Sequence, residues 1–343
     1  MRLALNVGYD GSDVVDRTDL VQEAEKLGYH SVWAAEAYGA DVVTALSWYA
    51  ARTERINVGA GIMQIPGRTP AMTAMTAVGL SELSGGRFLL GLGASGPQVA
   101  EGWHGQPYAK PLGRTREYIS LVRQMLAREE RVSFDGEHYQ LPYQGAGSTG
   151  LGRPLRMITH PSHNVPIYLA ASGPKNVALA AEIADGWLPI FWSPFRAPDA
   201  YRPMLDAGFA ASGDDTKRDR FDVVASVATV LTDAPEQALW AIKPTLALYI
   251  GGMGARGKNF YHDLACRYGY EAEANQIQDL YLEGKKQEAI AAVPDQLADE
   301  VSLVGPAGHI AERLEAWKES GVTTVSLMTS DLGTMRTVAE ILS

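Results

Sequence analysis

"SELSGGRFLLGLGASGP", residues 81–97, contains an apolar run bounded on both sides by glycines. The segment Phe88–Leu92 has the length and apolar character of a buried strand. Gly91, Gly93 and Gly96 lie in and just after this segment, and residues without a side chain let a backbone come close to another group. The stretch therefore predicts a buried strand that leads into a loop built for close contact.

The alternation of short apolar segments with amphipathic ones continues along almost the whole chain. Eight segments have the pattern of strands: Leu3–Val7, Ser31–Ala35, Ile56–Met63, Phe88–Leu92, Ile167–Ala171, Gly186–Ile190, Phe221–Leu231 and Val322–Met328. The segments with helical spacing are Asp16–Leu27, Asp41–Arg52, Thr69–Leu83, Arg114–Glu129, Pro174–Ala184 and Pro306–Ser320, with a longer helical region from Pro235 to about Leu297.

Eight strands joined mainly by helices predict an α/β protein, a (β/α)8 TIM barrel formed as a single domain by residues 1–343. A doubly wound open sheet is the alternative, since it produces the same alternation. The number of strands and the absence of a Pro-, Gly- or Ser-rich linker between two halves favour the barrel.

Three regions are longer than a barrel needs, namely 93–113 after strand four, 131–163 before strand five and 235–297 after strand seven. Within the second region, "FDGEHYQL" alternates as a hairpin does around Asp135 and Gly136. The first region leaves a strand at its carboxyl end, where barrel enzymes place their chemistry. Long loops at that end are often functional.

The overall composition excludes several classes of protein. There are 30 Lys and Arg against 40 Asp and Glu, a net charge of −10, which argues against a nucleic-acid partner. No stretch approaches the roughly 20 apolar residues of a membrane helix, and the N-terminus has no signal-peptide pattern. Cys266 is the single cysteine, and the seven histidines form no metal-binding motif. We expect a cytoplasmic protein with no metal and no membrane partner.

A second glycine-containing turn, "AASGPKN" at 170–176, leads from a strand directly into a helix. Ser172 suits the N-cap of that helix and Pro174 its first turn. The free amides of a helix N-terminus bind anions, and Lys175 adds a positive charge. The turn predicts a phosphate site, although a well-capped helix without a ligand has the same pattern. It is not a P-loop, and the chain contains no GxSxG nucleophile elbow.

Polar side chains follow the predicted strands where the mouth of a barrel would lie. Glu36 and Tyr38 follow the second strand, and Glu101, Trp103 and His104 lie in the loop after the fourth. Paired carboxylates at such positions are compatible with acid catalysis of the glycosidase kind. Solvated loop side chains are the alternative, and the residues alone leave both open.

Three blocks in order, "INVGAGIMQIPGRTP" at 56–70, "LSGGRFLLGLGASGP" at 83–97 and "PIYLAASGPKNVALAAEIADGWLP" at 166–189, resemble the bacterial luciferase-like superfamily. Within it, the chain is most similar to the deazaflavin branch, the coenzyme F420-dependent oxidoreductases of actinobacterial type. The resemblance extends along the barrel and is weakest from 234 to 299.

This resemblance implies a TIM barrel, often dimeric, with a flavin or deazaflavin across its mouth. The matching cofactor-binding positions fall in three groups: the bulged third strand (Ala60, Gly61, Ile62), the ring loop (Gly93, Ala94, Ser95, Gly96) and the phosphate turn (Ser172, Gly173, Pro174, Lys175). In the family a cis peptide, here expected between Gly61 and Ile62, presses against the ring. The glycines of the ring loop would admit the ring and its tail against bare backbone.

Two departures from the family pattern limit what can be assigned. The sugar-phosphate dehydrogenases of this branch have an acidic residue followed by histidine after the second strand, where this chain has Glu36 and Ala37. The methylenetetrahydromethanopterin reductases have a glutamate on the first strand, where this chain has Asn6. The remaining expectation is hydride transfer between C5 of the deazaflavin and a small organic substrate, with Glu36, Tyr38 and His104 as candidate proton donors.

Two other functions stay open at this point. An FMN-dependent luciferase-like monooxygenase would share the same ring cleft, and a non-catalytic deazaflavin-binding protein would need no proton donor. For both the F420-dependent oxidoreductase and the FMN-dependent monooxygenase, we expect a small-molecule substrate and a homodimer.

Overall fold

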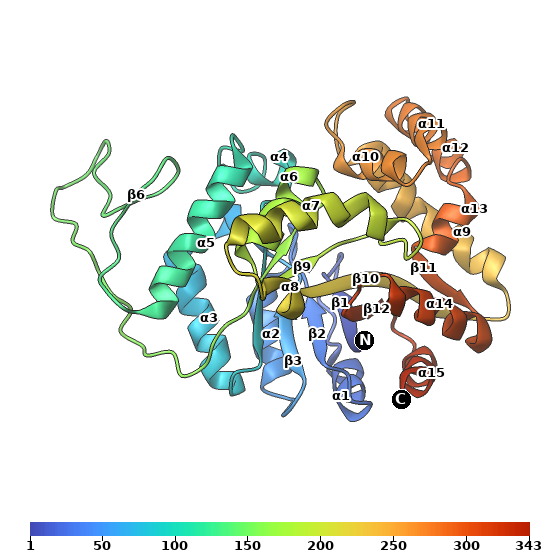
Figure 1. Cartoon of the computed structure of the whole chain (residues 1–343), viewed down its shortest axis with the longest axis horizontal. Helices are drawn as coiled ribbons and strands as arrows, with labels where there is room; N and C mark the ends of the chain where they lie inside the picture. Colours follow the sequence, from blue (N-terminus) through green and yellow to red (C-terminus); the bar gives the residue numbers. More distant parts are fainter.

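Eight parallel strands close into a barrel in the computed structural model, which describes residues 1–343 (Figure 1). The barrel strands are β1 (Arg2–Gly8), β2 (Ser31–Ala34), β3 (Asn57–Ala60) continued by β4 (Met63–Gln64), β5 (Phe88–Gly93), β8 (Ile167–Ala170), β9 (Gly186–Leu188), β10 (Asp222–Leu231) and β12 (Thr324–Met328). The ring closes because β12 pairs with β1 and β10 pairs with both β9 and β12. The predicted (β/α)8 barrel is confirmed.

Helices surround the barrel, and most of them begin and end where the sequence indicated. The outer helices are α1 (Thr18–Lys26), α2 (Val42–Ala50), α3 (Pro70–Ser84), α5 (Pro111–Ala127), α6 (Pro174–Ile183), α7 (Ala197–Ser212), α14 (Ala307–Glu319) and α15 (Leu332–Leu342), with the short α4 (Pro97–Ala100) and α8 (Lys217–Arg220) between them. Asp41 caps α2 by accepting the amides of Val43 and Thr44, and Gly85 ends α3 with a φ of 67°. Sequence patterns did not reveal α7 and α15.

The region after strand seven forms a helical subdomain on one side of the mouth (Figure 1). It contains α9 (Pro235–Ala247), a π-helical turn (Leu248–Gly252), α10 (Phe260–Arg267), α11 (Glu271–Leu282), α12 (Lys286–Ala291) and α13 (Asp295–Glu300). A strand that was not predicted, β11 (Ser302–Gly305), follows and pairs with the last four residues of β10. Its four residues lie between the predicted helical region and the predicted helix from Pro306, where the sequence analysis assigned no element.

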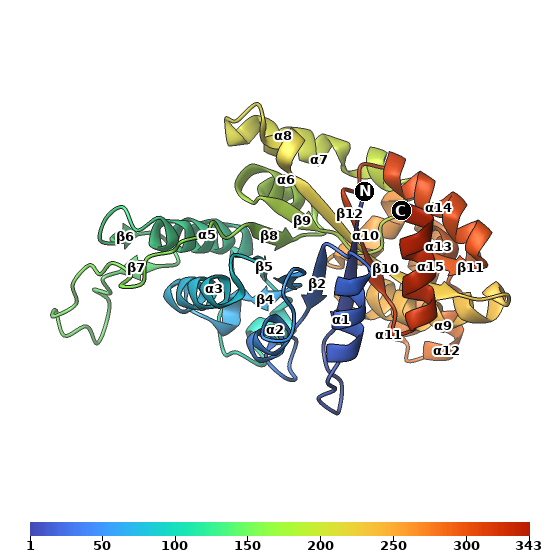
Figure 2. The same ribbon diagram turned by 90° about the horizontal axis from the view of Figure 1, so that it is seen from below.

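The region before strand five forms an arm that projects from the barrel (Figures 1 and 2). The predicted hairpin around Asp135 and Gly136 is present as β6 (Phe134–Asp135) paired antiparallel with β7 (Gln140–Leu141). Glu117 of α5 anchors its turn, because the carboxylate accepts the amides of residues 137, 138 and 139 at 2.9–3.1 Å.

The amino-terminal end of the barrel is filled by a polar cluster and, above it, by aromatic side chains. The buried carboxylate of Asp222 accepts the Tyr168 hydroxyl at 2.9 Å and pairs with Arg2 at 2.6 Å. Trp33 packs edge-on against the Tyr168 ring with 5.1 Å between centroids, and Gly59 leaves room for the indole. With this end filled, the open end lies at the carboxyl termini of the strands.

His30 lies beside this basal cluster and gives the protein a pH-dependent stability. Burial lowers the pKa of His30, and the nearby Arg2 lowers it further, although Asp222 opposes the shift. Below pH ~6.5 the unfolded chain takes up a proton at this imidazole and the folded chain does not, so stability falls as the pH falls. We expect His30→Gln to reduce the acid-side slope of the unfolding free energy by up to about 1.4 kcal/mol per pH unit.

Urea denaturation between pH 5 and 7.5 measures this slope in both proteins. An NMR titration of the His30 ring, with an expected midpoint below 6.5, provides an independent reading. A slope that is the same in the variant and the wild type would contradict the assignment.

Candidate active site at the barrel mouth

The third strand breaks at the mouth and carries its side chains toward the opening. Strand β3 ends at Ala60, and β4 resumes pairing with β5 through Met63 and Leu92. The peptide bond between Gly61 and Ile62 is cis, as expected. The Gly61 amide donates to the Ala34 carbonyl at 2.7 Å, and the Ile62 side chain is half-buried at the opening.

Two glycines of β5 lie against the bulge of the third strand. A Cβ on Gly91 would overlap the carbonyl oxygen of Ala60, and a Cβ on Gly93 would overlap the end of the Ile62 side chain. The bulge of the third strand therefore occupies the space that a side chain at residue 91 or 93 would need, and the predicted contact of Gly93 with a cofactor ring stays a prediction. Because Gly91 and Gly93 have no side chains, the bulge can pack closely against β5 and place Ile62 at the opening. Ala94, Ser95 and Gly96 follow, half-buried, with Ser95 at a φ of 57°.

Glu36 is held by a dense set of hydrogen bonds directly behind the bulge. One carboxylate oxygen accepts the Gln64 amide at 2.9 Å and also pairs with Arg68. The other oxygen accepts the Val42 amide, the first residue of α2, at 3.1 Å. The side chain is 7% exposed. Glu36 thus ties together three neighbouring segments of the mouth.

The two other candidate proton donors lie near Glu36. His104 places Nε2 2.8 Å from Oε1 of Gln64 and packs on Gly67, so it is connected to Glu36 through one residue. Tyr38 is exposed and faces Trp103, with ring centroids 6.4 Å apart. The structure therefore brings all three sequence-predicted residues to one side of the mouth.

Helix α6 begins shortly after β8, the barrel strand that pairs with β5. Gly173, rather than Ser172, is the N-cap, and no side chain caps the helix. This corrects the expected capping role of Ser172, whose hydroxyl instead lies near Tyr261 and partly offsets the effect of burial, which raises the pKa of that tyrosine. Lys175 is exposed, and its amide, in the first turn, has no helical carbonyl to bind.

Arg267, at the end of α10, is a site residue that sequence reasoning missed. Its guanidinium donates to the Ser172 carbonyl at 3.3 Å, and its Nε is buried without a partner. The guanidinium also lies 5.8 Å from the ring centroid of Tyr201. No local pattern could reveal it, because 95 residues separate Arg267 from Ser172 and only the fold brings them together.

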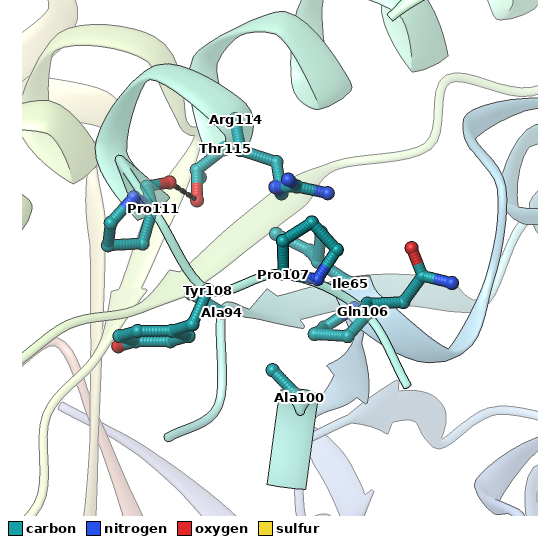
Figure 3. A pocket seen from close by; sticks show the side chains of 10 residues that line it. Ile65, Ala94, Ala100, Gln106, Pro107, Tyr108, Pro111, Arg114 and Thr115 are labelled. Carbon is teal, nitrogen blue, oxygen red and sulfur yellow. Dashed lines mark hydrogen bonds between the residues drawn. The ribbon is translucent and has the colours of Figure 1, made fainter. Parts of the chain in front are cut away.

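A small cavity lies beside the ring loop, between this loop and α5 (Figure 3). Ala94, Ala100 and Pro107 line it from the loop, and Arg114 and Thr115 line it from the helix. The Nε of Arg114 is buried without a partner. The cavity separates the loop from α5, so Ala94 borders the mouth on one side and this space on the other.

The structure offers no grouping of three His, Cys, Asp or Glu side chains able to hold a metal ion. Of its helices, none combines the length and the apolar character that crossing a bilayer requires.

The profile of the luciferase-like monooxygenases matches residues 4–324. The chain belongs to this family. A luciferase-like relative from Mycobacterium tuberculosis (strain ATCC 25618 / H37Rv), provisionally named a coenzyme F420-dependent oxidoreductase, is 46% identical over 343 residues, 99% of each chain.

Two solved structures share the barrel fold of this chain. The coenzyme F420-dependent tetrahydromethanopterin reductase of Methanopyrus kandleri superposes with a TM-score of 0.77 at 22% identity, covering 99% of this chain and 97% of its own. An F420-dependent secondary alcohol dehydrogenase, in complex with an F420–acetone adduct, gives 0.75 at 17% identity with the same coverage. At these identities the likeness concerns the fold.

Proposed function

We propose that this protein is a coenzyme F420-dependent oxidoreductase that transfers hydride between C5 of the deazaflavin and a small organic substrate. The observation that carries the proposal is the similarity to the mycobacterial relative over 99% of both chains. The geometry of the mouth supports it, because the three groups of positions taken from the family all lie at the carboxyl ends of barrel strands, after β3, β5 and β8.

The residues present fit such a cofactor. Ile62, carried inward on the bulge, would support the flat ring, and the loop from Ala94 to Gly96 would border it. The phosphate would lie at the first turn of α6, where the Lys175 amide has no helical acceptor and the buried Nε of Arg267 lacks a partner. When bound, F420 supplies a two-electron hydride carrier.

The protein's own residues position the reactants and supply the proton. Glu36 is fully engaged by two amides and Arg68, so we assign it the role of holding the bulge and the α2 terminus in place. Tyr38 and His104 are the candidates for proton transfer. The Gln64 contact uses Nε2 of His104, which leaves Nδ1 for a substrate or water.

Titration of the purified protein with F420 and, separately, with FMN tests the proposal. We expect micromolar binding of F420, followed by its fluorescence, and much weaker binding of FMN. Micromolar FMN binding without F420 binding would favour the monooxygenase. Tight F420 binding with no stimulated turnover over a broad panel of carbonyl, imine and alcohol substrates would favour a non-catalytic binding protein.

The phosphate contact leads to a specific prediction. A hydrogen bond to a charged group contributes roughly 1.5–3 kcal/mol, so Arg267→Ala is expected to weaken F420 binding about 10- to 100-fold. Lys175→Ala removes only the exposed ammonium and keeps the amide, so its loss should be less than about 10-fold. Arg256→Ala, which removes a cation already paired with Asp279 in the same subdomain, serves as the control. Equal affinities in Arg267→Ala and the control would remove Arg267 from the site.

We also propose a homodimer in which the projecting arm contacts a second copy. Leu151, Leu155 and Ile158 are all largely exposed on it. Between Tyr139 and Pro166 the arm has two arginines and no acidic residue, whereas the whole chain has a net charge of −10. The positively charged arm would therefore be attracted to the negatively charged surface of a second copy of this chain. The chain's one cysteine, Cys266 of α10, is free, which supports the separate proposal of a cytoplasmic location.

Light scattering of the protein on a sizing column tests the dimer. The double variant Leu155→Asp, Ile158→Asp is expected to give monomers with an unchanged thermal midpoint, because both side chains are exposed. A dimer that persists in the double variant would place the interface elsewhere.

A further inference from the structure

His104 is held at the mouth through both its backbone and its ring. The chain continues α4 as a helical turn, because the amides of Trp103 and His104 both donate to the Val99 carbonyl at 3.1 Å. The imidazole lies against Gly67, where an added Cβ would be 3.0 Å from Cε1. On the other side, Nε2 lies 2.8 Å from Oε1 of Gln64. The position of the ring is therefore fixed before any ligand binds.

The side chain of Gln64 lies on the face of β4 that borders the opening. Gln64 is in register with Gly93 of β5, and a Cβ on Gly93 would point at the Ile62 side chain. Residues in register on neighbouring parallel strands present their side chains to the same face, and successive residues alternate. Met63 accordingly faces the hydrophobic core, whereas Gln64 shares the face of Ile62. His104 covers Gln64 on this face.

The hydrogen bond to Gln64 determines which nitrogen of His104 carries the proton. Gln64 is only 4% exposed, and the hydrogen bond of its side chain goes to His104. An amide oxygen can only accept, so Nε2 is the donor and the lone pair of the neutral ring is on Nδ1. Nδ1 has no partner in the protein and is not among the fully enclosed polar atoms. It is therefore open to accept a proton.

A neutral amide is a suitable partner for a ring that must change its protonation state. Nε2 carries a hydrogen in both the neutral and the protonated imidazole, so the bond to Gln64 persists when Nδ1 takes up or releases a proton. A carboxylate in this place would favour the charged ring. Gln64 thus keeps His104 in one orientation through a complete proton-transfer cycle.

Two charged residues lie on the segments that pack against His104, and neither contacts its ring. Arg68, which follows Gly67, is paired with Glu36. Glu101, three residues before His104, accepts a backbone amide of its own loop at 3.2 Å. The side chain that bonds directly to the imidazole is therefore the uncharged Gln64.

Tyr38, the other candidate for proton transfer, has no comparable support. Its side chain is 68% exposed and contacts the Trp103 ring, and its hydroxyl forms no hydrogen bond within the protein. A group that transfers a proton must be oriented toward the reacting atom. His104 meets this requirement and Tyr38 does not.

We propose that Gln64 is a positioning residue that holds Nδ1 of His104 as the base for an alcohol substrate. This inference rests on the proposed function, because oxidised F420 is the oxidant. The C–H bond at the alcohol carbon breaks and its electron pair leaves with the hydride to C5 of F420. The hydroxyl proton passes to Nδ1, and a C=O bond forms. An alcohol needs this base, since it must lose a proton as it loses hydride, whereas an amine can form an iminium ion without one.

Long-range 1H–15N NMR of the protein without cofactor tests the role of Gln64, with the His104 signals assigned through His104→Gln. At pH ~8, where histidine is neutral, we expect the proton on Nε2 in the wild type. Gln64→Leu, which has no acceptor, should show both tautomers. Gln124→Leu, at an exposed glutamine of α5, is the matched control and should match the wild type. A proton on Nδ1 in the wild type, or an unchanged spectrum in Gln64→Leu, would overturn the proposal.

Turnover of a panel of primary, secondary, cyclic and aromatic alcohols by the F420-loaded protein tests the substrate class. We expect oxidation of at least one of them, with kcat rising with pH. Gln64→Leu should lower kcat roughly 10- to 100-fold at a similar KM, because the base is no longer oriented. His104→Gln should lower it roughly 100- to 10,000-fold. Gln64→Glu keeps an acceptor and should restore kcat, with the profile moved to higher pH, because the carboxylate favours the protonated ring.

A merely structural contact would leave the tautomer and the pH profile unchanged in the variants of Gln64. The fluorescence of F420 reports its binding in the same samples, and circular dichroism confirms that each variant is folded. If F420 fails to bind the wild type, the proposed function fails, and the alcohol step fails with it. If F420 binds and no alcohol is oxidised, or Nδ1 carries the proton, only this inference fails.

Discussion

Gly91→Ala is expected to leave the protein unfolded or insoluble, with a loss of about 3 kcal/mol or more in the free energy of unfolding. The added methyl group would overlap the carbonyl oxygen of Ala60, which is backbone and has no rotamer to escape into. Overpacking of a rigid interior costs about 1–3 kcal/mol and more where nothing can move. Urea denaturation of the soluble fraction, together with the yield of soluble protein, measures the effect.

Gly79→Ala is the matched control for this substitution. Gly79 is exposed on α3, and a Cβ there would meet nothing within 4 Å. Alanine is better than glycine in a helix by about 1 kcal/mol, so this variant should be more stable than the wild type. A Gly91→Ala protein as stable as the wild type would mean that the bulge does not need the space at residue 91.

Glu36→Ala is expected to cost about 3–5 kcal/mol of stability, because it leaves Arg68 and two amides without their acceptor in a nearly closed site. The bulge and the start of α2 would lose their common anchor, so F420 affinity should fall in parallel. Urea unfolding and F420 titration of the same preparations measure both effects.

Two comparisons separate anchoring from proton donation. The double variant Glu36→Ala, Arg68→Ala should be less destabilised than the sum of the single variants, because each single change already breaks the pair. Arg202→Ala, which breaks an exposed pair with Asp199, should cost less than about 1 kcal/mol. If Glu36→Ala were fully stable, bound F420 normally and lost only turnover, Glu36 would be the proton donor and our assignment would be wrong.

The main elements of the site were predictable wherever the signal is local. Pro174 and the glycine before it mark the start of α6 within three residues, and the alternation around Asp135 and Gly136 marks the hairpin. The cis peptide at Gly61 was expected because a block of sequence around it resembles a family. In each case neighbouring residues carry the information.

Contacts across the fold were not predictable in the same way. The sequence gives no sign that Gly91 and Gly93 make room for the bulge of the third strand, which packs beside both of them. Arg267 reaches Ser172 only because the helical subdomain packs against the start of α6.

The sequence by itself determined the eight-stranded barrel and the positions of its loops, since periodicity, caps and turn residues act over a few neighbouring residues. Only the tertiary structure decided which glycine accommodates which neighbour, which carboxylate is anchored and which aromatic side chains face one another. Those outcomes depend on distances between segments far apart in the chain, and such distances are set by packing of the whole barrel.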